Sequence, residues 1–173
     1  MKGYNYLLDA LAKLRDFSWE MRIIGDGPER DMLQSQANRL GLTNRVRFLG
    51  ERKDIPDLLS GADLYVQPSL LEGLPTTVTE AMFSCLPVIA TTVGGIAEQI
   101  DRSCGILVPP ANPDELARAI KLVLSTDKKE QMGKAARQKA EQKFSIDVCA
   151  TKYLHIYTVA AASRKALSLG QLA

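Results

Sequence analysis

The amino-acid sequence predicts an α/β fold in which a Rossmann-like parallel sheet carries helices on both faces and is followed by a helical C-terminal tail. Short apolar runs alternate with segments of helical periodicity, which is the order of elements that builds a parallel sheet. These runs are predominantly apolar, as in strands covered on both faces, and after Val108 the pattern becomes wholly helical. The length of 173 residues suits one compact domain of this kind.

Five runs are expected to be strands, because each is short and apolar and is followed by turn-forming residues or a helical segment. With helical crossovers between them, the strands would run parallel to one another. They are Met21–Gly25, Val46–Gly50, Asp63–Gln67, Pro87–Thr91 and Gly105–Val108.

Helices are expected where apolar residues recur every three or four positions. Asn112 is a typical helix cap, followed by a proline and two acids that match the helix dipole. Helical segments follow over 112–125, 128–142 and 145–166, so we predict a sheet domain over residues 1–143 and a helical tail over 144–173. The first helix would bury Leu7, Leu8, Leu11 and Leu14. The second would bury Met32, Leu33, Ala37 and Leu40 and would end at Gly41.

The composition excludes several classes of function. Twenty-two basic and twenty acidic side chains give a net charge of +2, so the bulk charge indicates no nucleic-acid partner. No apolar run is long enough to span a membrane, and no signal-peptide pattern opens the chain, so we expect a soluble, cytoplasmic protein. The segment from Lys121 to Lys143 holds seven basic and three acidic side chains. This excess fits a solvated helix face; an anionic partner, including a peripheral membrane contact, is the alternative.

Metal sites and histidine-dependent catalysis are not expected. Cys85, Cys104 and Cys149 show no metal-ligand spacing, and we interpret them as unpaired thiols in a reducing compartment. The single histidine, His155, lies in a late helical stretch with no nucleophile motif beside it.

Three loops at predicted carboxyl ends of strands have the composition of a binding site, and ligands of open parallel sheets bind at that edge. The first, Gly25-Asp26-Gly27-Pro28, lets the backbone approach an anion, although an ordinary tight turn has the same composition. The second covers residues 68–82 and enters a helix near Thr76 or Thr77. The third is Thr92-Val93-Gly94-Gly95.

The second loop carries two glutamates eight positions apart, Glu72 and Glu80. From Gly61 to Ile100 there are acids but no Lys or Arg, which favours carboxylates that accept hydrogen bonds from ligand hydroxyls over carboxylates in surface ion pairs. Two alternatives stay open: Thr77 and Glu80 also fit a helix capping box, and Glu72 fits an exposed loop carboxylate.

The run PSLLEGLPTTVTEAM, followed by LPVIATTVGGIAEQI and GILVPPANPDELARAI, resembles retaining GT-B glycosyltransferases of the large group 1 family. The likeness extends through IIGDGPERDMLQSQANRLGLTNRVRFLG, begins at Lys2-Gly3, and covers the chain to about Tyr157. In this context the two glutamates match the family's E-x7-E motif.

The resemblance implies roles for individual residues. Glu72 would be the catalytic residue, contacting the hydroxyls of the donor sugar, and Glu80 would bind the ribose of the nucleotide. Lys2 would help to neutralise the diphosphate, so that neither a metal ion nor another cofactor is needed. The diphosphate would lie on the loop that contains Gly73, Leu74 and Thr76. The backbone at Gly25 and Gly27 would approach the nucleotide. The base would be held by Gly50, Glu51 and Arg52.

The chain also departs from the pattern of the family that it resembles. Members usually have a strand ending in arginine before the Lys-Gly element, in the middle of the sheet, and an N-terminal domain that binds the acceptor. This chain shows neither, so we expect the first strand of the sheet to be missing and the fragment alone to be inactive. Pro75 and Cys85 stand where glycine is common, and Pro75 has no N–H to offer a phosphate.

We therefore expect the C-terminal, donor-binding domain of a retaining glycosyltransferase. The intact enzyme would be of the hexosyltransferase type, would act in carbohydrate biosynthesis, and would move a sugar from a nucleotide-diphosphate sugar to an acceptor. One alternative is a related GT-B enzyme, such as a sugar-nucleotide epimerase or a disaccharide synthase. The other is a non-catalytic nucleotide-sugar-binding or interaction module.

Overall fold

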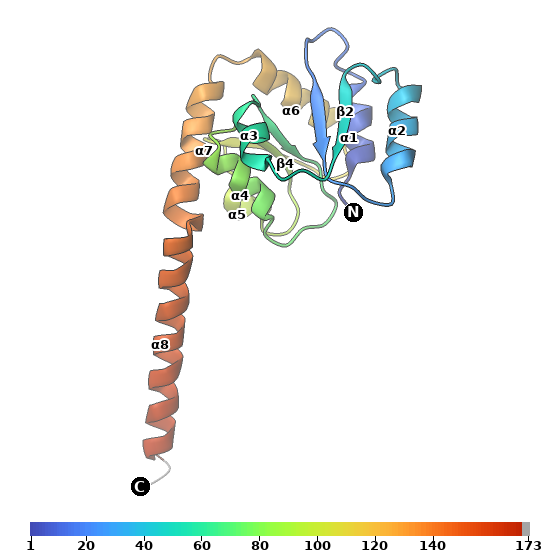
Figure 1. The fold of residues 1–173 in the computed structure, drawn as a ribbon. Coiled ribbons are helices and arrows are strands. Elements are labelled where there is room, and N and C mark those ends of the chain that lie inside the picture. The colour runs from blue at the N-terminus through green and yellow to red at the C-terminus, as the bar shows by residue number, and fades with distance from the viewer. Residues whose placement is uncertain (171–173) are drawn as a thin grey trace.

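A computed structural model describes the backbone of residues 1–170 and the side chains of residues 1–162. Strands and helices alternate through an α/β body, from which a long C-terminal helix extends (Figure 1). In chain order the elements are α1 Tyr4–Leu11, β1 Met21–Ile24, α2 Arg30–Arg39, β2 Val46–Gly50, α3 Ile55–Ser60, β3 Tyr65–Gln67, α4 Thr76–Phe83, β4 Val88–Thr91, α5 Ile96–Gln99, β5 Gly105–Val108, α6 Pro113–Ser125, α7 Lys129–Phe144 and α8 Ile146–Gly170.

The prediction of parallel strands flanked by helices is confirmed, and all five expected strands form. β3 and β4 begin later than predicted; at Pro87 the ring removes the N–H that a strand residue would donate. The strands lie in two hydrogen-bonded groups, β1–β2 and β3–β4–β5, and every pairing within them is parallel. Between these groups, β1 and β3 are not paired with each other.

The apolar residues form two clusters. α1, α2 and α6 contribute to the first cluster, with buried side chains such as Leu8, Leu33 and Ile120. α4, α5 and α7 contribute to the second, which includes Met82 and Ala136. β3, β4 and β5 have side chains in both clusters, so burial on both faces explains their hydrophobicity. β1 and β2 contribute to the first cluster and expose Arg22 and Arg47.

The predicted apolar face of α2 is wrong at one position. Leu33 and Ala37 are buried as expected, but the side chain of Met32 is 56% exposed. Adjacent helix residues are rotated by roughly 100° from each other, so Met32 cannot share the face of Leu33.

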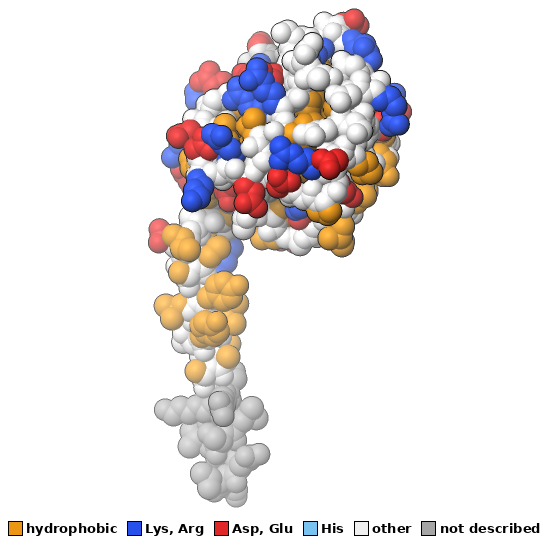
Figure 2. Space-filling model, turned by 45° about the vertical axis from the view of Figure 1, so that its right-hand side comes forward, with side chains coloured by type: hydrophobic (Ala, Val, Ile, Leu, Met, Phe, Trp, Pro, Cys, Tyr) orange, Lys and Arg blue, Asp and Glu red, His pale blue; other side chains and the backbone are white. Residues whose placement is uncertain are grey.

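The C-terminal helices follow the predicted pattern. The Asn112 side chain caps α6 by accepting a hydrogen bond from the amide of Glu115 at 3.1 Å, and Pro113 is the first helical residue. α8 packs on α7 and then leaves the body, with His155 exposed on it. Figure 2 shows apolar side chains on this exposed part of α8. The exposed apolar residues of this helix include Tyr153, Leu154 and Tyr157. Among the described residues, no helix is both long and apolar enough to cross a membrane.

The basic excess of residues 121–143 is largely a solvated face. In α7, Lys134 pairs with Glu130 at 2.5 Å and Arg137 pairs with Glu141 at 2.8 Å. Lys139 instead reaches across to Asp101, beyond α5, at 2.6 Å, and its side chain is only 13% exposed. This ion pair connects α7 to the segment that leads into β5.

We expect Asp101→Asn to lower the free energy of unfolding at pH 7 by about 1 kcal/mol, a value reduced for the exposure of the carboxylate. Hydrogen bonds from Lys139 and Ser103 hold the pKa of Asp101 well below its usual value. A lowered carboxyl pKa contributes stability above the unfolded-state pKa, and that contribution is lost as the pH falls toward the folded-state pKa. Urea unfolding should therefore show a difference between wild type and variant that shrinks below about pH 4. A difference that stays constant down to pH 3 would contradict the assignment.

Candidate functional site

The three loops predicted to form a site follow β1, β3 and β4, at the carboxyl ends of these strands. At this edge of a parallel sheet, the loops and the starts of the following helices converge. The loop after β3 contacts both of its neighbours in space: it is bonded to the N-terminal segment and to the loop after β4. The order of the elements thus brings together residues separated by up to 70 positions.

The Glu72 side chain is the centre of a hydrogen-bond network. Its Oε1 accepts from Lys2 Nζ at 2.7 Å, Ser69 Oγ at 2.8 Å and Gln67 Nε2 at 2.9 Å. Burial alone would raise the pKa of Glu72, but these hydrogen bonds outweigh it, so the pKa lies below its usual value and the carboxylate is ionised at neutral pH. Within the described part of the chain, all of these bonds converge on Oε1, which leaves Oε2 to accept from a ligand. Glu72 is therefore not a free surface carboxylate.

Two polar residues that the sequence analysis missed hold Glu72 in place. Gln67 is 6% exposed and Ser69 is fully buried, although both come from an otherwise apolar strand and its end. Tyr65 Oη donates to Gln67 Oε1 at 2.6 Å, and burial raises the pKa of Tyr65, so the phenol stays protonated. Thr91 Oγ1 donates to the carbonyl of Ser69 at 2.6 Å. The sequence held one signal for this network: Gln67, a polar residue, ends a mostly apolar strand directly before a candidate loop.

Two glycines permit the close approach of the loop that carries Glu72. A Cβ on Gly3 would lie 2.0 Å from the carbonyl oxygen of Pro68, and a Cβ on Gly94 would lie 2.0 Å from that of Glu72. Both glycines also have positive φ angles, 68° and 53°, which side-chain-bearing residues rarely adopt. The loop thus lies between two backbone segments, Lys2-Gly3 on one side and Gly94-Gly95 on the other.

The start of α4 is open to a ligand. Pro75 is its N-cap residue, and no side chain caps the helix, so the capping box of Thr77 and Glu80 does not form. The first-turn amides consequently lack intrahelical partners and side-chain caps. The buried Gln99 fixes this turn, because its Nε2 donates to the carbonyl of Pro75 at 3.0 Å and to Thr79 Oγ1 at 2.8 Å. The role of Gln99 had no signal in the sequence, since its partners lie 20 and 24 positions away.

A cavity of about 740 Å³ opens beside this edge, between β1 and β3. The amide of Gly25 donates to the carbonyl of Gly50 at 2.7 Å, so the loops after β1 and β2 lie together at its rim. Arg52 is held by a bidentate pair with Asp54, whose pKa is lowered by that pairing. Of the predicted site residues, those that line the cavity are Lys2, Gly25, Glu51, Arg52 and Glu80.

The other predicted residues do not line the cavity. Glu72 is paired with Lys2, which lines the cavity. Thr76 is the first residue of α4. Leu74 is 52% exposed. The amide of Gly27 donates to the side chain of Asp26 at 2.7 Å and is therefore already engaged. Glu80 is exposed and no hydrogen bond to its carboxylate is found within the described residues, so it can accept from a ligand.

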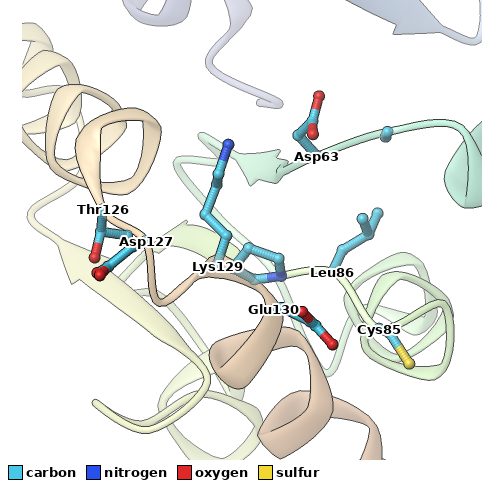
Figure 3. A pocket seen from close by; sticks show the side chains of 9 residues that line it. Asp63, Cys85, Leu86, Thr126, Asp127, Lys129 and Glu130 are labelled. Carbon is cyan, nitrogen blue, oxygen red and sulfur yellow. The ribbon is translucent and has the colours of Figure 1, made fainter.

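A second hollow lies at the opposite edge of the sheet. It measures about 350 Å³ and lies where β3 and β4 begin and α6 ends. Figure 3 shows Lys129 extending into it, with Asp63 on one side and Asp127 on the other. Since ligands of parallel sheets bind at the carboxyl edge, this hollow is not the candidate site.

Chemically, the carboxyl edge combines the carboxylates of Glu72 and Glu80 with the ammonium group of Lys2 and the uncapped first-turn amides of α4. Carboxylates accept from hydroxyl groups, and a helix start with a lysine attracts an anion. Within the described residues, no three Cys, His, Asp or Glu side chains are grouped as a metal site would require. The edge thus suits a ligand that carries both hydroxyls and negative charge.

Comparison with known proteins identifies relatives across nearly the whole chain. An uncharacterized glycosyltransferase of Methanocaldococcus jannaschii is 33% identical over 164 residues, which are 92% of this chain and 42% of that protein. The alpha-D-kanosaminyltransferase of Streptomyces kanamyceticus is 32% identical, over 90% of this chain and 42% of its own length. The chain spans less than half the length of these curated relatives.

Solved structures show the same fold. Anabaena HepE in complex with UDP and glucose is 33% identical and superposes with a TM-score of 0.84 over 91% of this chain and 45% of its own. The C-terminal domain of a group 1 glycosyl transferase from Francisella tularensis is 25% identical, with a TM-score of 0.75, over 84% of this chain and 80% of that domain. The α/β fold described above is therefore that of the C-terminal domain of GT-B glycosyltransferases. The family model "Glycosyl transferases group 1" matches residues 1–139, and the chain belongs to this family.

Proposed function

We propose that this chain is the donor-binding part of a retaining glycosyltransferase that uses a nucleoside-diphosphate sugar. The observation that carries the proposal is the convergence of Lys2, Glu72, Glu80 and the uncapped start of α4 at one edge of the sheet. The structures of Anabaena HepE with UDP, UDP and glucose, or UDP-glucose support a ligand of this class. Residues 1–143 would form the donor-binding unit and residues 144–173 a helical tail.

In the proposed complex the carboxylates bind the hydroxyls. Glu72 Oε2 accepts from the donor sugar, while Oε1 stays bound to its three donors and fixes the carboxylate plane. Glu80, at the rim of the cavity, accepts from the ribose. A carboxylate held in one orientation selects one orientation of the sugar and pays little entropy when the ligand binds.

The diphosphate would lie at the start of α4. As the bond between sugar and diphosphate breaks, negative charge develops on the leaving phosphate, and aimed donors stabilise that charge. The first-turn amides of α4 are such donors. Lys2 supplies the positive charge, and its ammonium group is at the same time paired with Glu72. Gln99 acts as a positioning residue for this turn, and no metal ion is required in this scheme.

Binding of the nucleotide should depend on Glu80. We expect Glu80→Ala to weaken UDP binding about tenfold or more, because a hydrogen bond to a charged group is worth roughly 1.5–3 kcal/mol. Titration calorimetry with UDP measures the loss, and Glu98→Ala, an exposed acid on α5, is the matched control that should bind normally. Equal affinities for wild type and Glu80→Ala would reject the ribose assignment.

The sugar moiety should depend on the Glu72 network. Glu72→Gln and Gln67→Met are expected to weaken binding of UDP-glucose severalfold, whereas binding of UDP changes little, since the network faces the sugar and not the nucleotide. The comparison of both ligands on each variant, with circular dichroism to verify the fold, separates this role from general destabilisation. Parallel losses for UDP and UDP-glucose would contradict it.

The isolated chain should bind but not transfer. Its relatives are more than twice its length, and we propose that the acceptor is bound by a part of the enzyme outside these 173 residues. Incubation with radiolabelled UDP-glucose and simple sugar acceptors should yield no glycosylated product. Product formation above the no-protein control would overturn this assignment and would favour a complete catalytic unit.

The non-catalytic binding module is the second candidate, and it rests on the exposed apolar residues of α8, which suit a docking helix. Normal UDP binding by a Glu72→Gln and Glu80→Ala double variant would favour that module over a donor site.

A further inference from the structure

We propose that Tyr65 is a positioning residue for the donor sugar, because it fixes the side-chain amide of Gln67 in the one orientation that donates to Glu72. The part that concerns the sugar rests on the proposed function. The orientation of the amide follows from the hydrogen bonds alone and can be tested without a ligand.

The network around Glu72 has one consistent assignment of its hydrogens. The Glu72 carboxylate is ionised, so its Oε1 can only accept. The end of the Gln67 amide that lies 2.9 Å from this oxygen must therefore be the nitrogen, Nε2. The amide oxygen then faces Tyr65 Oη at 2.6 Å, and since an amide oxygen only accepts, the phenol must donate. The charge of Glu72 thus determines the direction of each hydrogen bond back to Tyr65.

The phenol of Tyr65 holds the Gln67 amide against a flip. Gln67 Nε2 also donates to Ser69 Oγ at 2.9 Å, and the Ser69 hydroxyl donates in turn to Glu72 Oε1 at 2.8 Å. A flipped amide would place its oxygen against the carboxylate, where two acceptors repel each other. Within the described residues, Tyr65 is the only group found to donate to Gln67 Oε1. Because Gln67 is buried, bulk water has little access to replace this bond.

The position of the phenol is fixed by the strand and by packing. Tyr65 and Gln67 lie two positions apart in β3, so their side chains leave the same face of the strand. The Tyr65 ring packs against the second apolar cluster. Burial raises the pKa of Tyr65, and a hydrogen bond with Thr77, in the first turn of α4, opposes this rise without cancelling it. The phenol therefore stays protonated, and able to donate, where Glu72 titrates.

The titratable groups that face Glu72 come from three elements: Lys2 before α1, Tyr4 on α1 and Tyr65 on β3. The loop after β4, residues 92–95, also touches Glu72 and has no titratable side chain. The charge of Glu72 helps to raise the pKa of both phenols, and the charge of Glu80 adds to this effect at β3. The hydrogen bond from Gln67 contributes to lowering the pKa of Glu72, so its loss should raise that pKa.

The test follows the titration of the Glu72 carboxyl carbon by carbon-13 NMR in the 173-residue chain without ligand. Tyr65→Phe removes only the phenol oxygen, and the pKa of Glu72 should rise, because the amide of Gln67 is then free to turn its oxygen toward the carboxylate. In a Gln67→Met background, Tyr65→Phe should have no further effect, since its action passes through Gln67. Tyr4→Phe is the matched control and should leave the titration unchanged, because no hydrogen bond of the Tyr4 phenol is found within the described residues.

Titration calorimetry then connects the network to the ligand. Tyr65→Phe should weaken binding of UDP-glucose severalfold at pH 7 and change binding of UDP little, because only the sugar contacts Glu72. The loss for UDP-glucose should grow as the pH falls toward about 5, since a raised pKa leaves less of the carboxylate ionised. A merely structural role of the ring would weaken both ligands equally and would leave the pH profile unchanged.

Three results would overturn the proposal. The first is an unchanged Glu72 titration in Tyr65→Phe, with circular dichroism showing an intact fold. The second is an equal rise of the pKa when Tyr65→Phe is made in the Gln67→Met background, and the third is equal losses for UDP and UDP-glucose. A wild type that does not bind UDP-glucose would reject the donor site itself, whereas normal binding by both wild type and Tyr65→Phe would reject the role of Tyr65 alone.

Discussion

The architecture of the site depends on one steric constraint: the loop after β3 is held between two backbone walls at contact distance. Gly3 touches Pro68 on one side and Gly94 touches Glu72 on the other, and neither position has room for a Cβ. This confinement brings Lys2 to Glu72 and leaves the first turn of α4 beside them. The carboxylate, the cation and the free amides therefore occupy fixed relative positions before any ligand binds.

The polar interior behind the loop extends the same constraint. Tyr65, Gln67 and Ser69 form a chain of hydrogen bonds that ends at Glu72, and Thr91 ties it to β4. Buried polar groups are costly unless each finds a partner, so a satisfied network of this kind specifies one arrangement. Gln99 holds the first turn of α4 through its Nε2, while its buried Oε1 has no hydrogen-bond partner among the described residues. The site is thus supported by residues that would not contact the ligand.

The sequence was sufficient for the fold, and the loops that it predicted to carry a site follow β1, β3 and β4 at the carboxyl ends of these strands. Short, predominantly apolar runs predicted the strands, and the cap at Asn112 predicted the start of α6 within one residue. Patterns within one segment were predictable because they depend on neighbours in sequence. Gln67, Ser69 and Gln99 were missed because their roles depend on partners in other elements. The division of the strands into two groups, β1–β2 and β3–β4–β5, was not predicted, since strand pairing depends on partners that no local pattern reports.

Trp19, the only tryptophan of the sequence, lines the cavity and can serve as its intrinsic fluorescent probe. The indole N–H of Trp19 donates to the carbonyl of Leu14 at 2.8 Å, and the guanidinium of Arg45 stacks on the ring at 3.9 Å. Any occupant of the cavity changes the polarity around this single fluorophore. Its emission therefore reports on changes in the space between β1 and β3 without a label.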